Sequence, residues 1–380
     1  MVKCFVTGDN HIGKKYDRYP EIRDLLIESR FECLQDMIQY AERDKCELFI
    51  VTGDLFENTN TVKVADVKQV AEILAAFSGT VLVLPGNHDY YTGDEKVWQD
   101  FEKALAKLDH NVVLLNKNQA YIFDTMEETV VVYPAYCQSK HSENNNLGWI
   151  KQAQINPSVI NIGVAHGAIQ GVTPDMNGQY FIMTEQELLD IPVDAWMIGH
   201  THIPYPNCLK ETEETTGYKI FNAGTHVQTD LSNATEGNGF IISISKEDGK
   251  KKVSARKYVS GKIRFYDLKG QMKPQSDTAL FDGLSDMLKD ISCNSVIRVK
   301  LSGAVKQTEY ERKEEIYKEL FGKYLTYEVD DRELNEEISV EKIRAEYAQT
   351  SFAAQFLEQF IGNPAELQMA YELVKACKDK

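Results

Sequence analysis

The feature that most constrains this chain of 380 residues is a pattern that occurs five times along it. Each time, a short apolar run ends in a turn that contains Gly together with Asp, Asn or His. The runs are rich in Val, Ile or Phe, which is typical of buried strands. The five polar turns are residues 8–11, 53–56, 85–89, 166–167 and 199–202. We therefore expect an α/β fold whose strands end, one after another, in the same kind of polar turn.

The segments between the first three runs indicate how these strands pair. Apolar residues recur at helical spacing over residues 22–41 and over residues 64–77. Strand–helix–strand units imply parallel pairing, so the carboxyl ends of the strands share one edge of the sheet. Ligands bind at that edge in open α/β sheets. We therefore expect the five polar turns to converge on one site.

The residue types in these turns predict a metal site. Asp, Asn and His together suit Mn²⁺, Fe or Zn²⁺ rather than metals that prefer thiolates. The seven candidate ligands, too many for one ion, are Asp9, His11, Asp54, Asn87, His166, His200 and His202. Two ions roughly 3.5–4 Å apart that share a carboxylate can clamp a phosphoryl group and activate a water. One such turn could be ordinary turn chemistry, but five in succession favour a phosphoesterase centre.

In this order, the five turns resemble the D-x-H, GD, GNH-D/E, H and GH-x-H series of the calcineurin-like metallophosphoesterases. The resemblance implies a four-layer α/β/β/α sandwich that binds two divalent ions. It also implies two ligand groups and a shared carboxylate: Asp9, His11 and His202 for one ion, Asn87, His166 and His200 for the other, and Asp54 between them. It assigns to His88 a catalytic role, in which His88 stabilises the phosphate or protonates the leaving oxygen. It assigns to Asp89 the role of orienting His88.

Within this superfamily, two motifs resemble those of DNA repair exonucleases of the SbcD type, the nuclease partners of an SMC-like ATPase. The motifs are GDLF at residues 53–56 and GNHD at residues 86–89. The corresponding motifs of protein phosphatases resemble GD-x-x-DRG and GNHE instead. Residues 11–13 are similar to the H-L-G of the nucleases, and residues 221–226 and 236–240 resemble their Gly-Ser turn and their later E-x-G-F strand. The resemblance implies an exonuclease of DNA repair, with single-strand endonuclease activity in addition. Mn²⁺ is the expected ion, and Fe and Zn²⁺ are the alternatives.

The length of the chain exceeds that of a usual single core, so more than one domain is expected. We expect a nuclease domain over residues 1–263, a smaller α+β capping domain over residues 264–337 and a pair of helices over residues 338–380. Residues 296–303 alternate between apolar and polar side chains, and residues 325–329 also read as a strand. The resemblance places the domain that contains these two strands over the nuclease site.

Two further regions carry expectations about protein partners. Residues 339–361 and 364–378 are amphipathic. One face of the first segment carries three aromatic residues at i, i+4 spacing: Phe352, Phe356 and Phe360. The resemblance implies that these helices bind the coiled coil of an SMC-like ATPase, and a packed helix pair without a partner is the alternative. It also implies a homodimer through residues 62–77 and 96–108.

The charge of the chain counts against DNA as the partner. Lys and Arg number 42 against 58 Asp and Glu, a net charge of −16, whereas nucleic-acid-binding proteins usually present a basic surface. Lys14, Lys15 and Tyr90 are candidates for substrate contact, and solvated or packed side chains are the alternative for each. A phosphoesterase of a nucleotide or another small phosphodiester or phosphomonoester is therefore the second hypothesis. An inactive scaffold is the third, and the complete ligand set disfavours it.

The remaining sequence features concern the compartment. The seven cysteines include no CxxC pair, which predicts reduced thiols. No apolar run approaches the roughly 20 residues that span a bilayer, and the N-terminus lacks the layout of a signal peptide. We therefore expect a cytoplasmic protein with no membrane partner.

Overall fold

The computed structural model describes residues 1–172, 178–233, 235–247 and 249–378. The chain divides into two compact units, Met1–Arg264 and Phe265–Lys380. The first unit contains all five polar turns. The second contains the segments expected to form the capping domain and the C-terminal helices. No helix in the described ranges is long and apolar enough to cross a membrane.

Two β-sheets form the centre of the first unit. Their strand orders are β4-β3-β2-β1-β11-β12-β9 and β10-β8-β7-β6-β5. The strands of the first sheet are β1 (Val2–Thr7), β2 (Leu48–Val51), β3 (Thr80–Val83), β4 (Val112–Leu114), β9 (Thr215–Thr216), β11 (Gly237–Glu247) and β12 (Lys250–Ser260). Those of the second are β5 (Tyr121–Asp124), β6 (Thr129–Ala135), β7 (Ile160–His166), β8 (Ala195–Gly199) and β10 (Ile220–Asn222). The runs β4-β3-β2-β1 and β6-β7-β8-β10 are joined by parallel pairs, so the predicted parallel pairing is confirmed.

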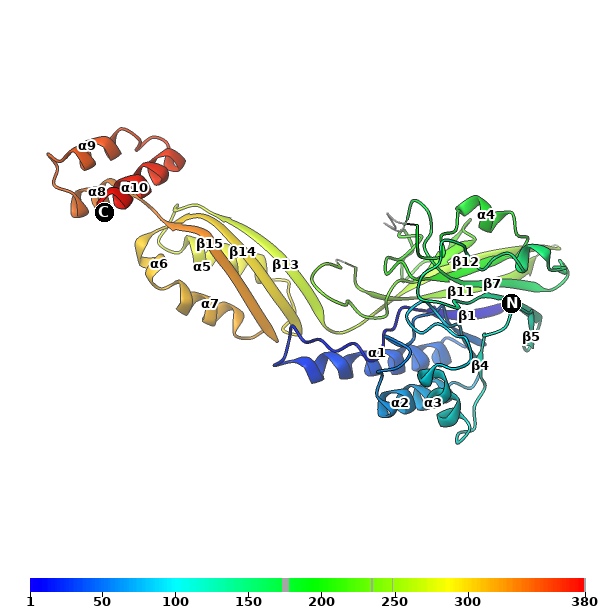
Figure 1. The fold of residues 1–380 in the computed structure, drawn as a ribbon. Coiled ribbons are helices and arrows are strands. Elements are labelled where there is room, and N and C mark those ends of the chain that lie inside the picture. The colour runs from blue at the N-terminus through cyan, green and yellow to red at the C-terminus, as the bar shows by residue number, and fades with distance from the viewer. Residues whose placement is uncertain (173–177, 234, 248, 379–380) are drawn as a thin grey trace. The chain divides into compact units, whose positions relative to one another are not determined.

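Three helices cover one face of the first sheet. They are α1 (Arg23–Arg43), α2 (Val64–Ala75) and α3 (Lys96–Leu105), which Figure 1 shows on the same side of β1. Phe5 of β1 and Phe49 of β2 share a core with Leu34 of α1 and Val70 of α2. The helical spacing over residues 22–41 and 64–77 therefore marks the faces that bury against this sheet.

The opposite faces of the strands build the other layers. Side chains alternate along a strand, so Val6 and Ile50 point away from the helices and share a core with Val164 of the second sheet. The outer face of the second sheet is covered by α4 (Glu185–Leu189) and a 3₁₀ helix at Ile150–Gln152. The first unit is therefore the predicted α/β/β/α sandwich.

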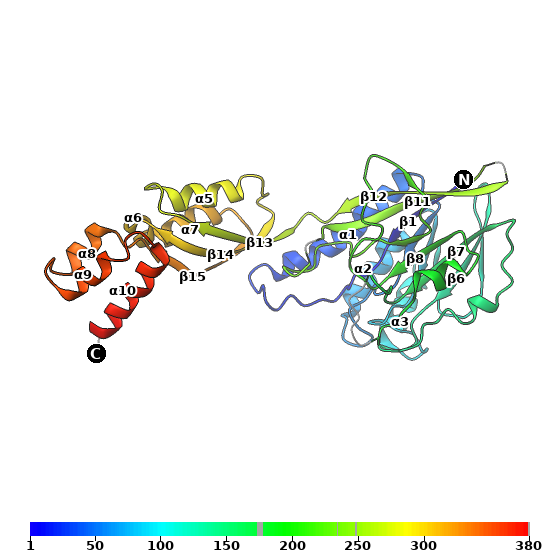
Figure 2. The same ribbon diagram turned by 90° about the horizontal axis from the view of Figure 1, so that it is seen from above.

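The second unit contains a small sheet and two groups of helices. The sheet order is β13-β14-β15, with β13 at Arg264–Met272, β14 at Ser295–Val305 and β15 at Thr326–Glu336. One face of this sheet packs against α5 (Ala279–Leu288) and α7 (Lys313–Phe321), and the short α6 (Gln307–Glu311) precedes α7. Figure 2 shows this α+β part from above. The remaining helices, α8 (Val340–Glu346), α9 (Phe352–Glu358) and α10 (Pro364–Lys378), form a separate small core.

The C-terminal segment corrects one prediction. We expected a pair of helices after residue 338, with one helix over residues 339–361, but the chain forms α8 and α9 there and α10 after them. Helix α8 ends at its C-cap residue Tyr347, whose backbone is extended with φ −128° and ψ 133°. The side chain of Ser351 then caps the next helix by accepting a hydrogen bond from Ala354 N at 3.2 Å. A cap of this kind starts a new helix rather than continuing the old one.

Candidate metal centre

The five polar turns meet at one edge of the two sheets. Beyond the ends of β1 and β2 the turns continue to pair, because His11 N donates a hydrogen bond to Asp54 O at 2.9 Å. The two sheets are joined at the same edge, where His166 Nδ1, at the end of β7, lies 2.9 Å from Thr52 O beyond β2. The structure therefore brings together turns that are far apart in the chain.

The backbone of these turns is unusual. Five of the seven ligand candidates have positive φ: Asp9 at 49°, His11 at 45°, Asp54 at 51°, His200 at 105° and His202 at 59°. Such conformations cost about 1–3 kcal/mol each and gather at functional sites. Gly53 has φ 105°, and a Cβ at this position would lie 2.1 Å from His166 Nδ1. The second motif therefore needs glycine both for its backbone and for the approach of His166.

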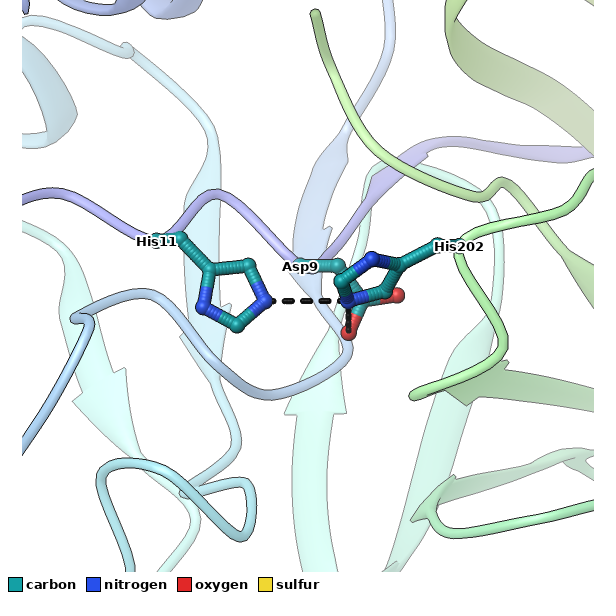
Figure 3. A group of neighbouring side chains, drawn as sticks. All are labelled: Asp9, His11 and His202. Atoms are coloured by element: carbon teal, nitrogen blue, oxygen red, sulfur yellow. Dashed lines mark hydrogen bonds and ion pairs between the residues drawn. The ribbon is translucent and has the colours of Figure 1, made fainter. Parts of the chain in front are cut away.

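Asp9, His11 and His202 form the first group of donor atoms, each with one donor atom within 4.8 Å of the others. Figure 3 shows the two imidazoles facing each other beside the carboxylate. His11 Nε2 and His202 Nε2 are 3.0 Å apart, and His202 Nε2 lies 3.9 Å from Asp9 Oδ1. The residues that the resemblance assigns to one ion are therefore neighbours in space.

The second group lies beside the first and shares Asp54 with it. Asn87 Oδ1 is 3.0 Å from both His166 Nε2 and His200 Nδ1. Asp54 Oδ2 is 3.4 Å from His166 Nε2 and 3.8 Å from His11 Nε2. Asp54 thus lies between the two groups, in the place that a bridging carboxylate would need.

The donors of both groups match the requirements of divalent ions. The carboxylates of Asp9 and Asp54 are buried, and within the described ranges their ion-pair partners are histidines rather than Lys or Arg. Buried carboxylates are costly without a compensating charge. Backbone amides donate to both carboxylates, His200 N to Asp9 at 2.9 Å and His88 N to Asp54 at 2.8 Å, but an amide does not neutralise the charge. Two divalent cations would satisfy all of these donors, so the residues fit the dinuclear centre.

The pKa shifts show the same lack of positive charge. Burial raises the pKa of Asp9 to about 7, and the charge of Asp54 adds to the effect. Burial also opposes ionisation of Asp54, but His166 and His11 hold the pKa of Asp54 below its usual value. Burial opposes protonation of His166, yet Asp54 and Asp9 raise the pKa of His166 to about 9. Burial and the neighbouring His11 lower the pKa of His202 to about 3. A divalent cation removes this uneven sharing of protons, since it favours ionised carboxylates and neutral imidazoles.

His88 lies at this centre, but its orienting partner differs from the predicted one. We expected Asp89 to orient His88. The carboxylate of Asp89 instead accepts hydrogen bonds from Gly86 N at 2.7 Å and Phe56 N at 2.9 Å. Asp89 therefore joins the third motif to the second. The ring of His88 is held from elsewhere, because its Nδ1 lies 3.0 Å from the main-chain carbonyl oxygen of Glu57.

Glu57 is a residue at the centre that the motif comparison did not select. Its Oε2 lies 3.1 Å from His11 Nδ1, within ion-pair distance, and the group His11, Glu57 and His88 has its donor atoms within 4.8 Å of one another. Burial opposes ionisation of Glu57, but His11 and Lys14 hold the pKa of Glu57 below its usual value. The available signal was an acidic residue directly after GDLF.

Arg30 is a second such residue. Its guanidinium is almost completely buried, and Nε and Nη2 donate to Asn10 O at 3.0 and 2.6 Å. Nη1 donates to Tyr16 Oη. Asn10 stands between Asp9 and His11, so Arg30 holds the backbone that carries two ligand candidates. The signal for it was an arginine on the apolar stripe of α1.

The candidates for substrate contact are placed unequally. Lys14 is half-buried, and its charge reaches Glu57 at the centre. Lys15 is exposed. Tyr90 is half-buried, and its main-chain carbonyl oxygen lies 3.3 Å from Trp98 Nε1. Of these three residues, Lys14 is the one whose charge lowers the pKa of a residue at the centre, Glu57.

The chain is similar to known metallophosphoesterases. The family described as calcineurin-like phosphoesterase matches residues 2–204, a range that contains all seven ligand candidates and His88. A curated relative, "Uncharacterized metallophosphoesterase YhaO" from Bacillus subtilis (strain 168), is 25% identical over 180 residues. The match covers 46% of this chain and 41% of that protein, so the chain spans about two fifths of the length of this relative.

Solved structures of phosphoesterases also align with the chain. Calcineurin-like phosphoesterase YfkN from Bacillus subtilis is 14% identical with a TM-score of 0.39, over 68% of this chain and 90% of that one. Purple acid phosphatase PPD1 from yellow lupin (Lupinus luteus) seeds is 14% identical with a TM-score of 0.37, over 68% of this chain and 53% of that one.

Proposed function

The chain belongs to the calcineurin-like phosphoesterase family, and on that premise we propose that it is a nuclease that hydrolyses the phosphodiester bonds of DNA. Membership of the family and the groups of metal-binding residues make it a metal-dependent phosphoester hydrolase. The finer assignment is an exonuclease of DNA repair, of the SbcD type, with single-strand endonuclease activity in addition.

The residues of the centre divide the chemistry between them. Three sets of residues would hold the ions: Asp9, His11 and His202; Asn87, His166 and His200; and Asp54 between the two. The ions would supply positive charge to the phosphoryl oxygens and activate the attacking water. The water would lose one proton to solvent as its oxygen bonds to phosphorus, and the bond from phosphorus to the 3′ oxygen of the DNA would break.

His88 supplies the proton for the leaving oxygen. The carbonyl oxygen of Glu57 can only accept a hydrogen bond, so the 3.0 Å contact requires that His88 Nδ1 carries a hydrogen. Nε2 is then the nitrogen that can serve the substrate. In the protonated ring, the hydrogen on Nε2 moves to the 3′ oxygen as the bond breaks.

The pairing of GDLF with GNHD carries the proposal of DNA as the substrate, because it resembles the motif pair of the repair exonucleases. Asp89 of GNHD bonds directly to Phe56 N of GDLF and to Gly86 N within its own turn. Asp89 is completely buried. A glutamate, as in the phosphatase-type GNHE, is one methylene longer and would shift this turn. The two nuclease-type motifs therefore depend on each other.

The ion and the partners belong to the same proposal. We propose Mn²⁺ as the ion, with Fe and Zn²⁺ as alternatives, since Asp, Asn and His accept all three.

The C-terminal helices expose apolar side chains, with Phe352 81%, Met369 67% and Leu373 59% exposed. Such side chains suit a coiled-coil partner, so we propose the SMC-like ATPase for this module. Phe356 and Phe360 instead pack against the small core of the C-terminal helices. A homodimer through α2 and α3 and a cytoplasmic location complete the proposal.

A second function fits the same centre. A nucleotide or another small phosphodiester or phosphomonoester presents the same phosphoryl group to the two ions. The net charge of −16 favours a small substrate, because such a substrate needs no extended basic surface.

The experiment that separates the two functions uses both kinds of substrate. End-labelled linear DNA and bis-p-nitrophenyl phosphate are incubated with the full-length chain and Mn²⁺, beside a His88→Ala variant. We expect the wild type to degrade the DNA and the variant to lose this activity. Hydrolysis of the small diester with the DNA intact would favour the second function.

A further inference from the structure

Glu57 contacts two histidines of the centre at once. Its Oε2 lies 3.1 Å from His11 Nδ1, and its main-chain carbonyl oxygen lies 3.0 Å from His88 Nδ1. The rings of His11 and His88 meet edge to face, with centroids 4.8 Å apart. Glu57 therefore joins an ion ligand to the proposed proton donor.

The main chain of Glu57 is held independently of its side chain. Its amide donates to Ile12 O at 2.9 Å, and Ile12 and Phe56 form a parallel bridge. Asp89 holds Phe56 N at 2.9 Å. These bonds fix the direction of the Glu57 carbonyl, so a substitution at position 57 exchanges the carboxylate and leaves the carbonyl in place.

The carboxylate lies on the Nδ1 side of His11, at ion-pair distance but without a hydrogen bond to that nitrogen. A negative charge at this place favours the tautomer with hydrogen on Nδ1 and leaves the lone pair on Nε2. Nε2 is the nitrogen that faces His202 Nε2 at 3.0 Å. Carboxylates in this position orient metal-binding histidines and raise their basicity. The Glu57 side chain is also 29% exposed, so filling of the core does not account for it.

We propose that Glu57 is a positioning residue that directs His11 toward one ion through its carboxylate and His88 toward the substrate through its carbonyl. The proposal rests on the metal-dependent hydrolysis of the family and does not depend on DNA being the substrate. The two contacts can be separated by mutation, because only the first uses the side chain.

The test measures the binding of Mn²⁺ alone. Full-length protein is treated with EDTA, dialysed and titrated with Mn²⁺ by calorimetry and by EPR, for the wild type, Glu57→Gln and Glu57→Ala. The control is Glu72→Gln, which changes an exposed glutamate on α2. We expect Glu57→Ala to weaken one of two Mn²⁺ sites by about 10- to 100-fold and to leave the other unchanged. Glu57→Gln should weaken it less, because an amide oxygen keeps a partial negative charge beside His11 Nδ1 but not the full charge of the carboxylate.

The carbonyl contact is tested by kcat and KM for bis-p-nitrophenyl phosphate hydrolysis at saturating Mn²⁺. The kcat should be the same in the wild type and Glu57→Ala, and a lower kcat would contradict the separation of the two contacts. Wild-type Mn²⁺ affinity at both sites in Glu57→Ala would overturn the proposal, as would an equal loss at both sites. If Glu57→Ala fails to fold by circular dichroism, wild-type affinity in Glu57→Gln overturns it. Failure to cut DNA would refute the proposed substrate and leave this inference standing.

Discussion

Asp9 and Asp54 of the first unit and Glu309 of the second are buried carboxylates with different surroundings. All eight histidines lie in the first unit, where Asp9 and Asp54 are buried among imidazoles. The second unit has no histidine, and its buried acid among the described residues is Glu309. Glu309 accepts hydrogen bonds from Leu280 N at 2.9 Å and Phe281 N at 3.1 Å, at the start of α5. A carboxylate at a helix N-terminus is stabilised by the chain itself. The same holds for Asp89 of the first unit, whereas Asp9 and Asp54 face imidazoles at a site that fits cations.

The exposed charges of the second unit agree with this contrast. On the face of its sheet opposite the helices, Arg298 pairs with Asp267 at 2.6 Å and Arg332 pairs with Asp330 at 2.7 Å. Exposed pairs of this kind contribute about 0–1 kcal/mol. These charges of the second unit are satisfied in pairs, whereas Asp9 and Asp54 of the first unit are arranged for a ligand. The comparison teaches that an incompletely compensated buried charge, and not burial alone, marks the functional site.

The largest effect is expected for Asp54→Ala, which removes the carboxylate shared by both ligand groups. We expect hydrolysis of bis-p-nitrophenyl phosphate to fall to the background without metal, because neither ion keeps its full set of donors. Metal content after dialysis against Mn²⁺ should fall as well. The control Asp109→Ala changes an exposed acid of the same unit and should keep both properties. An Asp54→Ala variant with two bound Mn²⁺ would break the comparison.

A smaller effect is expected for Arg30→Met, which keeps an unbranched apolar stem, shorter than the arginine side chain, but removes the donors to Asn10 O. We expect the free energy of unfolding of the first unit to fall by about 1–3 kcal/mol, since a buried carbonyl loses its partners. All three tryptophans lie in the first unit, so urea unfolding followed by tryptophan fluorescence reports on that unit. Arg43→Met, an exposed arginine on the same helix, is the control. Equal stability of the two variants would contradict a role for the buried guanidinium.

The histidines of the first unit should also make its stability depend on pH. Burial, followed by the charge of Arg30, lowers the pKa of His226 well below its usual value. His226 is therefore neutral in the folded state, while the unfolded chain takes up a proton below a pH of about 6.5. Stability from this group is present above that pH and is lost as the pH falls through it, by about 1.4 kcal/mol between pH 7.5 and 5.5.

The measurement is urea unfolding at both pH values, followed by tryptophan fluorescence in EDTA, so that ion binding does not contribute. His226→Gln should show a smaller loss of stability than the wild type. The same loss in both proteins would assign the pH dependence to other groups.

The smallest effect is expected for Glu309→Gln in the second unit. The amide oxygen still accepts from the start of α5 but has no charge to interact with the helix dipole, so we expect a loss of about 0.3–1 kcal/mol. Urea unfolding followed by far-UV circular dichroism should detect this loss of stability. Urea unfolding followed by tryptophan fluorescence, and Mn²⁺ binding, should match the wild type. A change in Mn²⁺ binding would show that the units do not differ as described.

The residue patterns predicted the strands and helices of the first unit and the place where the polar turns meet, and the resemblance supplied the four layers. The patterns follow from local chemistry, since short apolar runs indicate buried strands and helical spacing sets which face of a helix is buried. Parallel pairing then puts Asp9 and Asp54 at one edge of the first sheet, and His166 joins them from the second sheet. The same local reasoning was wrong for residues 339–361, where Ser351 caps a new helix within an amphipathic segment.

Only the tertiary structure decided which side chains support this edge. Asp89 is next to His88 in sequence, yet its carboxylate bonds to Phe56 N, while His88 is held by the carbonyl of Glu57. Arg30 reaches Asn10 from a helix that follows it in the chain. The motifs specify residue types and spacing, but the partner of a side chain depends on its direction in space. That direction is set when the turns after β1, β2 and β3 pack against one another, and no local pattern contains it.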